Sequence, residues 1–347
     1  MIDNQPRGNY SLMPKYARLF LALWIGIASI LTTGSSVGVK LVTKPPIVLM
    51  VPNAEIVSGS LCLNRKDVKD EDFNWLYIPV KPEELHTEVD YFFLAGQLIQ
   101  NGVVDASKCP AGGLTENGYA NACGAAKARD IVLQMQNLYD SEILNAWKQV
   151  GVPPVMLKQL IRYESQFWPH RYGAYHFGLG HVTYYGAYTA LTWSPVLYNI
   201  TCSATYGGAC QKELVDDMMV GSLLGMMDAS CPTCEWKVNV PKAKTSIFYL
   251  AHTLLAYCRQ ASQTVYNATD LTNPSEVVDY ATIWKLTLFN YNVGPTCLYN
   301  AVNEAESAVA GIKLTWTDIS NYVYDDNCLR GVEYVNNITQ RFYDFTP

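Results

Sequence analysis

The sequence predicts a mainly α-helical protein with an N-terminal transmembrane helix and a small membrane-proximal region of α/β or irregular structure. Three observations support this fold class. Apolar residues recur at helical spacing in most segments after residue 124, residues 19–39 carry no charge, and β-like runs are confined to residues 45–51 and 74–80. A chain of 347 residues that is 49% hydrophobic can bury one core of about 200 residues and a smaller appendage.

The N-terminal segment predicts a membrane anchor. Residues 1–18 are polar and contain more basic than acidic side chains, and residues 19–39 follow without a charge. About 20 apolar residues span a bilayer as a helix, and a basic flank remains in the cytoplasm. We therefore expect a cytoplasmic tail, a single-pass signal anchor in the cell membrane, and an extracytoplasmic chain from residue 40. A signal peptide cleaved near residues 33–36 and a buried core helix are the alternatives.

Residues 40–123 form the expected membrane-proximal region. It contains a charged stretch at residues 65–72, a helical pattern at residues 83–101, and a loop rich in Gly, Asn and Ala at residues 109–123. A loop of this composition needs a disulfide bond to hold its conformation. We expect the region to be a spacer or brace for the domain that follows it, or a docking surface for a partner.

Residues 124–347 form the expected main domain, and helical patterns dominate it. One short helix is opened by Pro153 and Pro154 and ends near Trp168, because the proline that follows forbids its continuation. Residues 188–210 are expected to form a loop region that contains Tyr and Gly. Further helical patterns lie at residues 125–150, 213–227, 244–265 and 276–289.

The ten cysteines favour an oxidising compartment, since their even number permits complete pairing. Spacing suggests three disulfides: Cys109 with Cys123, Cys202 with Cys210, and Cys231 with Cys234. The last pair has the form of a redox or zinc motif, but no βαβ pattern surrounds it and no second pair offers zinc spacing. A structural disulfide is the better interpretation, and the partners of the other cysteines stay open.

The charge pattern excludes several functional classes. The formal net charge of −6 provides no basic face for nucleic acid, and no glycine-rich phosphate loop is present. The five histidines include no pair at the helical spacing of metal ligands. We therefore expect no nucleic-acid partner, no metal and no cofactor.

Glu164 takes a core-facing position near the end of the short helix. It shares a stripe with Leu157, Ile161 and Trp168 at spacings of four, three and four residues. Burial and the negative end of the helix both disfavour a charged carboxylate, so we expect a raised pKa. A carboxylic acid that stays protonated near neutral pH can act as a general acid. The alternative is a glutamate at the edge of the core whose carboxylate reaches solvent or an arginine.

Four segments resemble, in the same order, motifs of the soluble lytic transglycosylases, which are related to goose-type lysozyme and cleave peptidoglycan. They are GVPPVMLKQLIRYESQFWP at residues 151–169, Gly178-Leu179, FNYNVGP at residues 289–295, and Glu333-Tyr334-Val335. The resemblance covers residues 124–345 and implies a lysozyme-like domain.

The resemblance also implies the reaction. Glycoside hydrolysis usually needs two carboxylates, and the sequence offers no second one in a comparable motif; Asp216, Asp217 and Asp228 are better interpreted as a solvated helix face. Lytic transglycosylases use one glutamate twice. It first protonates the bond between N-acetylmuramic acid and N-acetylglucosamine, and then takes a proton from the muramoyl C6 hydroxyl to close a 1,6-anhydro ring. Glu164 would be that residue.

The resemblance implies substrate contacts at further positions. Ser165 would orient the glutamate or touch sugar, Tyr291 would bond the glutamate or the substrate, and Asn292 would shape the turn that presents Tyr291. Plain alternatives are a helix-end cap for the serine and turn chemistry for the other two. The expected substrate-binding residues are Ser165, Gly178, Leu179, His181, Tyr291 and Asn292. Aromatic side chains that suit sugar stacking, or ordinary packing, are Trp168, Tyr172, Tyr175, Phe177, Tyr184 and Tyr185.

The chain departs from the family at one place, where Gly180-His181 replaces a Met-Gln pair that binds sugar. His181 would either replace the glutamine as a hydrogen-bonding group or add positive charge at mildly acidic pH. A domain that has kept its shape and lost its activity is the other interpretation.

The expected partners are peptidoglycan glycan strands, the membrane and an envelope protein complex. Two alternatives to the transglycosylase remain. One is a catalytically inactive lysozyme-like structural subunit of a membrane or cell-envelope complex. The other is a lysozyme-type glycoside hydrolase, in which water replaces the C6 hydroxyl.

Overall fold

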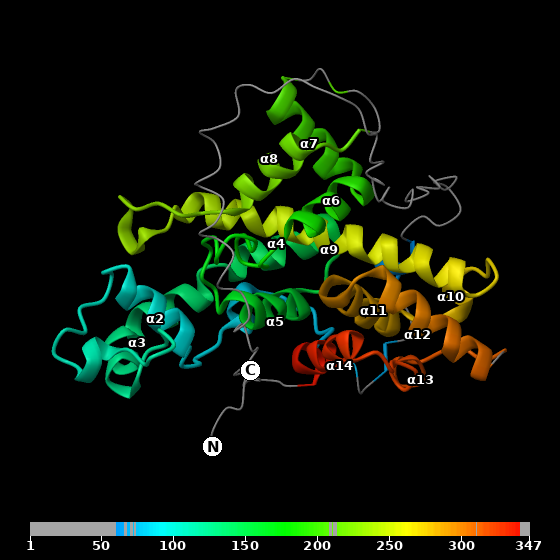
Figure 1. Cartoon of the computed structure of the whole chain (residues 1–347), viewed down its shortest axis with the longest axis horizontal. Helices are drawn as coiled ribbons and strands as arrows, with labels where there is room; N and C mark the ends of the chain where they lie inside the picture. The colour runs from blue at the N-terminus through cyan, green and yellow to red at the C-terminus, as the bar shows by residue number, and fades with distance from the viewer. Residues whose placement is uncertain are drawn as a thin grey trace, which may run out of the picture. The chain divides into compact units, whose positions relative to one another are not determined.

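The structure, a computed structural model, describes residues 60–65, 68–69, 72, 74–207, 210, 214–309 and 311–340. All of them belong to one compact unit, Val51–Pro347. The described part is mainly helical and contains no β-strand, as Figure 1 shows. Its helices, in order, are α1 (Ser60–Leu63), η2 (Pro82–Leu85), α2 (Phe92–Gln100), η3 (Pro110–Gly113), α3 (Ala122–Asn137), α4 (Asp140–Val150), α5 (Pro154–Ser165), α6 (Tyr184–Trp193), α7 (Pro195–Tyr206), α8 (Asp217–Met227), η4 (Glu235–Lys237), α9 (Val240–Ala268), α10 (Pro274–Val277), α11 (Tyr280–Val293), α12 (Pro295–Ala308), α13 (Trp316–Ser320) and α14 (Asp326–Thr339).

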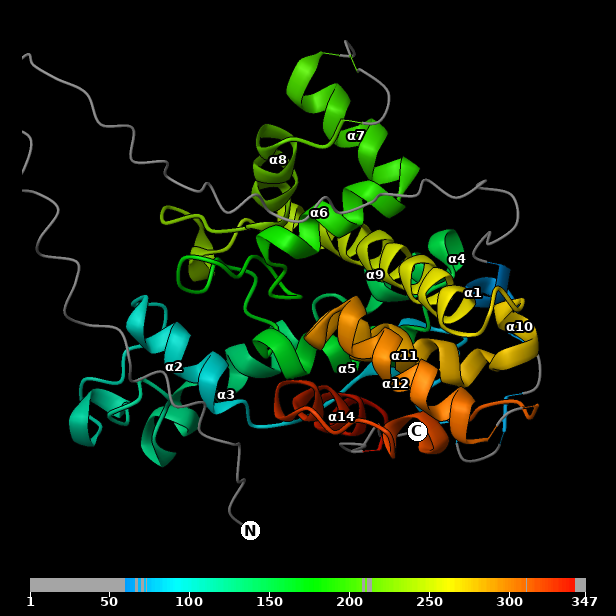
Figure 2. The ribbon, with the colours of Figure 1, turned by 45° about the vertical axis from the view of Figure 1, so that its right-hand side comes forward.

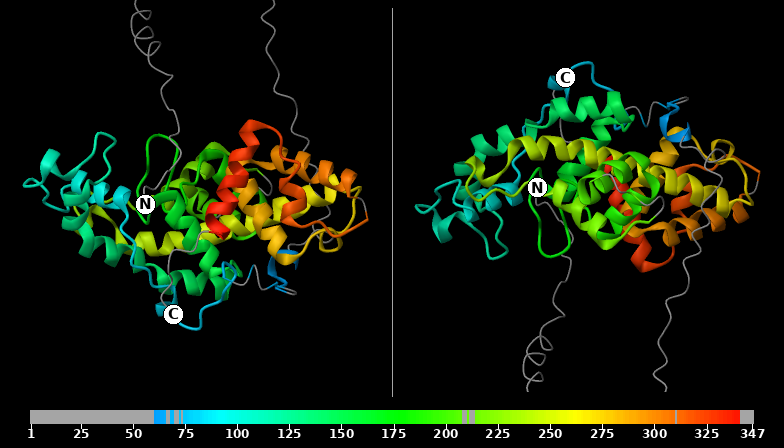
Figure 3. Two further views of the ribbon diagram at one scale, coloured as in Figure 1. Left: turned by 90° about the horizontal axis from the view of Figure 1, so that it is seen from below. Right: turned by 90° about the horizontal axis from the view of Figure 1, so that it is seen from above.

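The long helix α9 is the centre of the fold. It begins where the Asn239 side chain accepts a hydrogen bond from the Lys242 amide, with a proline in its first turn, where a missing N–H costs little. It packs against α4, α6, α11 and α12. Figure 3 shows α2 and α3 near one end of α9 and α10 to α13 near the other.

Helix α5 carries Glu164 in its last turn, as the sequence predicts. It ends at Ser165 rather than near Trp168, because Gln166 and Phe167 adopt left-handed conformations with φ of 46° and 67°. The Gln166 side chain then accepts hydrogen bonds from the Phe93 and Leu94 amides at the start of α2. The end of one helix therefore caps the beginning of another.

A buried ion pair joins α5 to α4. The Lys158 ammonium group donates to the Asp140 carboxylate at 2.6 Å and to the backbone carbonyl of Leu85. Burial lowers the pKa of Lys158 to about 8 and raises the pKa of Asp140 to about 6, while the attraction between the two charges opposes both shifts. Both groups are therefore charged at neutral pH, and α4 and α5 are held together by a paired and hydrogen-bonded contact.

The described residues between 60 and 123 belong to the same compact unit as the described residues after 123. The Cys62–Cys258 disulfide joins α1 to α9, and Lys285 on α11 donates to Asp72 at 2.6 Å. One disulfide to α9 and one ion pair to α11 therefore pack the described part of the expected membrane-proximal region against the main domain.

Several predicted elements differ in their bounds. The predicted helix at residues 125–150 is two helices, since the chain breaks at Leu138 and Tyr139. The predicted helix at residues 83–101 is η2 and α2 with irregular chain between them. The predicted loop at residues 188–210 is mostly α6 and α7, because Pro195 and the capping side chain of Ser194 start a new helix directly after the first one.

The β-like runs do not form strands in the part of the chain that the structure describes. Residues 74–80 are turn and irregular chain, while residues 45–51 lie outside the described residues. The helices predicted at residues 244–265 and 276–289 are present as α9 and as α10 with α11. The helix predicted at 213–227 is α8, whose expected start at residue 213 is not among the described residues.

The three predicted disulfides are confirmed. Two further pairs, Cys62–Cys258 and Cys297–Cys328, complete the set, so that all ten cysteines are bonded. Spacing predicts only the short loops, since the two further pairs join residues that folding brings together, with sequence separations of 196 and 31.

Among the described residues, no helix has both the length and the apolar character needed to cross a bilayer. The predicted tail at residues 1–18 and the predicted anchor at residues 19–39 lie outside the described residues.

The Cys62–Cys258 disulfide closes a loop with a sequence separation of 196, and Cys231–Cys234 closes one with a separation of 3. Because a crosslink restricts the unfolded chain more when its loop is longer, replacing Cys62 and Cys258 with alanine is expected to lower the free energy of unfolding by about 4–5 kcal/mol. The same replacement of Cys231 and Cys234 should cost only about 1–2 kcal/mol. Urea denaturation of both variants measures the loss in free energy of unfolding. Equal losses would contradict the larger contribution expected from the longer loop.

Candidate active site

Glu164 lies in the last turn of α5, and its side chain is 17% exposed. The Tyr334 hydroxyl donates a hydrogen bond to its Oε1 atom at 2.6 Å, and the His181 Nδ1 atom lies 3.7 Å from its Oε2 atom. Burial raises the pKa of Glu164 to about 7, and the hydrogen bond from Tyr334 opposes that rise. The raised pKa expected from the sequence is present, with burial as its cause.

Tyr334 reaches Glu164 from α14, which packs against both α5 and α11 (Figure 2). Its side chain is almost fully buried, and its ring meets the ring of Tyr163 edge-on at a centroid distance of 5.0 Å. Burial and the nearby Glu164 carboxylate hold the pKa of Tyr334 well above its usual value. Tyr334 therefore remains protonated and serves Glu164 as a hydrogen-bond donor.

The short loop at residues 177–182 forms the opposite side of the site. Phe177 and Val182 pair through two backbone hydrogen bonds, and Gly178 adopts a φ of 66° with its Cα close to α8. A Cβ atom at position 178 would lie 2.5 Å from the backbone oxygen of Met227, so only glycine fits there. This turn brings His181 to Glu164.

Two of the expected site residues hold this loop through its backbone. The Ser165 hydroxyl donates to the carbonyl of Leu179 at 2.8 Å, and the Tyr291 hydroxyl donates to the carbonyl of Gly180 at 2.6 Å. Ser165 is completely buried. In this structure neither hydroxyl bonds Glu164; instead, both fix the loop against α5 and α11.

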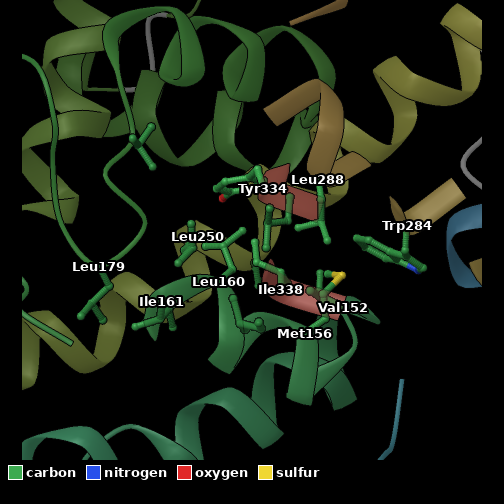
Figure 4. Close-up of a cluster of buried hydrophobic side chains, with 14 of the residues drawn as sticks. Val152, Met156, Leu160, Ile161, Leu179, Leu250, Trp284, Leu288, Tyr334 and Ile338 are labelled. Atoms are coloured by element: carbon green, nitrogen blue, oxygen red, sulfur yellow. The ribbon is translucent and has the colours of Figure 1, made fainter. Parts of the chain in front are cut away.

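A buried apolar cluster includes Leu179 of this loop and Tyr334, the hydrogen-bond partner of Glu164, as Figure 4 shows. It combines side chains of α5, α9, α11 and α14 with Leu179 from the loop. Ile161 of α5, Leu179 of the loop and Tyr334 of α14 are all buried members of it. The cluster supplies the low-dielectric surroundings that disfavour the charged form of Glu164.

His181 does not add positive charge at mildly acidic pH, contrary to one of the two expectations. Burial lowers the pKa of His181 to about 4, with a smaller contribution from His176, so the imidazole is neutral above that pH. The 3.7 Å approach to Glu164 is therefore not an ion pair at neutral pH, and it is longer than a hydrogen bond. The Nε2 atom of His181 is buried and has no hydrogen-bond partner among the described residues.

Gly180, which stands where the transglycosylase motif has a methionine, lacks a side chain for a steric reason. A Cβ atom at this position would lie 2.4 Å from the Leu250 side chain and 3.0 Å from the Tyr291 hydroxyl oxygen. Leu250 on α9 therefore occupies the space that a longer side chain at position 180 would need.

The remaining expected contact, Asn292, lies in the last turn of α11 and is half-buried. Its Oδ1 atom is buried, with no hydrogen-bond partner in the described part of the chain. Glycine at position 294, with a φ of 86°, ends the helix and starts α12.

The three acidic residues expected on a solvated helix face lie at the ends of α8, where Asp217 is exposed and Asp216 and Asp228 are half-buried. Asp216 caps α8 and accepts a hydrogen bond from Tyr206 at 2.5 Å. Asp217 pairs with the Tyr184 hydroxyl, and Asp228 accepts from the Ser230 hydroxyl at 2.5 Å. In the described part of the chain, no group of three or more His, Cys, Asp or Glu residues is arranged to hold a metal ion.

The role of Tyr334, which donates a hydrogen bond to the candidate acid Glu164, was not predicted from the sequence. A signal was present, since Glu333-Tyr334-Val335 was one of the four matching segments. The contact joins residues 170 positions apart, so it depends on how α14 packs against α5.

A comparison of the chain with models of known protein families, with curated proteins and with solved structures finds no match. The function of the protein is therefore inferred from the geometry and electrostatics of this site.

The raised pKa of Glu164 makes the stability of the fold depend on pH. Between about pH 4.5 and pH 7 the unfolded chain has lost the Glu164 proton while the folded chain retains it, so this residue lowers the stability as the pH rises. Glu164→Gln removes the effect, and its free energy of unfolding relative to the wild type should increase by about 3 kcal/mol from pH 4 to pH 8. Glu304→Gln, which changes an exposed carboxyl on α12, is the matched control in urea denaturation. A difference that does not change with pH would show that Glu164 titrates normally.

Proposed function

We propose that this protein is a membrane-anchored lytic transglycosylase with a lysozyme-like domain. In this proposal it cleaves the bond between N-acetylmuramic acid and N-acetylglucosamine in peptidoglycan and forms a 1,6-anhydro product. The proposal rests on the state of the Glu164 carboxyl. This group is largely buried, has a pKa raised to about 7 and accepts a hydrogen bond from the Tyr334 hydroxyl. One group of this kind can both give and take a proton at neutral pH.

In the first step Glu164 is the general acid. Its protonated carboxyl donates a proton to the glycosidic oxygen while the bond from that oxygen to the muramoyl C1 atom breaks. The hydrogen bond from Tyr334 stabilises the carboxylate that remains, since a hydrogen bond to the charged form favours it. Tyr334 engages Oε1, so Oε2 is the oxygen on the side of His181.

In the second step Glu164 is the base. The carboxylate accepts the proton of the muramoyl C6 hydroxyl as its oxygen attacks C1, which closes the 1,6-anhydro ring. The carboxyl is thereby protonated again and ready for the next cycle. No second carboxylate is required, in agreement with the local, structural roles of Asp216, Asp217 and Asp228.

The remaining site residues have binding or positioning roles in this proposal. The loop from Gly178 to His181, held by Ser165 and Tyr291, presents the neutral His181 imidazole beside the reacting groups. His181 lies beside Glu164, and Asn292 lies in the last turn of α11, one residue after Tyr291.

Five disulfides in the described part support an oxidising location outside the cytoplasm. The proposed cellular arrangement is a single-pass anchor at residues 19–39 and an extracytoplasmic catalytic domain at the peptidoglycan, within an envelope complex.

A structural subunit is the second candidate, because the hydroxyls of Ser165 and Tyr291 are used inside the protein. A hydrolase would use the same glutamate and differ only in its acceptor, water.

The test is mass spectrometry of purified peptidoglycan incubated with the full-length chain in detergent. The wild type and the control Glu304→Gln are expected to release 1,6-anhydromuropeptides, and Glu164→Gln should release them at least about 100-fold more slowly. Reducing-end products that depend on Glu164 would identify a hydrolase. No product from folded wild-type protein would contradict catalysis and favour the structural subunit.

A further inference from the structure

A continuous series of aromatic rings leads away from the candidate acid. The His181 ring, beside Glu164, stacks on the ring of Tyr172 at a centroid distance of 5.5 Å and an interplanar angle of 17°. Tyr172 meets Phe93 edge-on at 5.6 Å, and Phe93 meets Tyr119 edge-on at 5.7 Å. The series therefore passes from the loop beside the acid to α2 and the chain that follows it.

The members of this series alternate between buried and exposed side chains. Phe93 is buried, while Tyr172 is 49% and Tyr119 is 39% exposed. Burial raises the pKa of Tyr119, and the nearby Tyr172 adds to that rise, which agrees with the proximity of the two side chains. Two tyrosines are thus presented to solvent on a common support, Phe93.

The chain holds Tyr119 in a defined position. Its backbone carbonyl accepts hydrogen bonds from both the amide and the hydroxyl group of Thr115, and the next amide, Ala120, donates to the carbonyl of Phe92. The Cys109–Cys123 disulfide closes this loop. An exposed ring on a covalently closed and hydrogen-bonded loop loses little conformational freedom when a ligand binds to it.

The position of α2 relative to the acid is also fixed. The Gln166 side chain accepts from the Phe93 and Leu94 amides, and Gln166 lies two residues after Glu164. Since the Phe93 ring contacts both Tyr119 and Tyr172, the end of α5 positions these two tyrosines as well as Glu164.

We propose that Tyr119 and Tyr172 form a sugar-binding subsite that extends the Glu164 site onto α2 and the loop closed by Cys109 and Cys123. Its ligand is a ring of a glycan strand that lies beyond the pair of sugars being cleaved. This inference rests on the proposed function and adds to it, because Tyr119 lies outside residues 124–345, which carry the resemblance to transglycosylases.

The chemistry of the two side chains fits this ligand. The C–H groups of a sugar ring carry partial positive charge and pack against the electron-rich face of an aromatic ring. A tyrosine also offers a hydroxyl that can bond the sugar at the edge of the stack. The subsite needs no charge, which suits a polymer whose sugar rings are neutral apart from their lactyl and peptide groups.

The test measures binding without turnover. The full-length Glu164→Gln chain in detergent is titrated calorimetrically with an octasaccharide of alternating N-acetylglucosamine and N-acetylmuramic acid. Adding Tyr119→Leu or Tyr172→Leu is expected to weaken binding by roughly threefold to tenfold, the size of one aromatic contact. Tyr119→Phe keeps the ring and should keep most of the affinity, which separates stacking from folding.

Tyr324→Leu, which removes another exposed ring from the segment before α14, is the matched control and should bind like its parent. If both leucine variants bind as tightly as the parent, the subsite is disproved and the proposed function stands. If the parent itself binds no octasaccharide while it remains folded, the proposed function fails, and this inference fails with it.

Discussion

The burial of the Glu164 carboxyl is the constraint on which the site depends. A carboxylate removed from water must be neutralised or hydrogen-bonded, because an isolated charge in an apolar setting is unstable. The protein does both in part: burial raises the pKa of Glu164 to about 7, and Tyr334 donates a single hydrogen bond. This balance lets the carboxyl gain or lose its proton near neutral pH, and it depends on the packing of α14 against α5.

The rest of the described fold keeps that balance in place. Ser165 and Tyr291 hold the carbonyls of the loop that closes the site, and the loop in turn presents a neutral histidine instead of a cation. A charged histidine at this distance would favour the carboxylate and lower the pKa of Glu164. The left-handed end of α5 also fixes α2 through Gln166, so the part before residue 124 is tied directly to the candidate acid.

Local rules predicted the local features of this chain well. Helical periodicity and the flanking prolines placed Glu164 in a last helical turn, and short cysteine spacings identified three disulfides. Features that depend on packing were missed. The bond from Tyr334 and the Cys62–Cys258 disulfide join segments far apart in the sequence, and the shortened end of α5 depends on the left-handed Gln166, whose side chain caps another helix. The sequence left open whether His181 is neutral or charged for the same reason, since its burial cannot be read from its neighbours in the sequence.

The most direct test of this account is a titration of the Glu164 carboxyl group by carbon-detected NMR of protein labelled at glutamate side chains. The Glu164→Gln spectrum identifies the resonance by its loss. We expect this carboxyl to titrate with a midpoint of about 7, well above the ordinary glutamate value of 4.5. A midpoint near 4.5 in the folded protein would show that Glu164 is an ordinary carboxylate, and the acid and base roles assigned to it would be withdrawn.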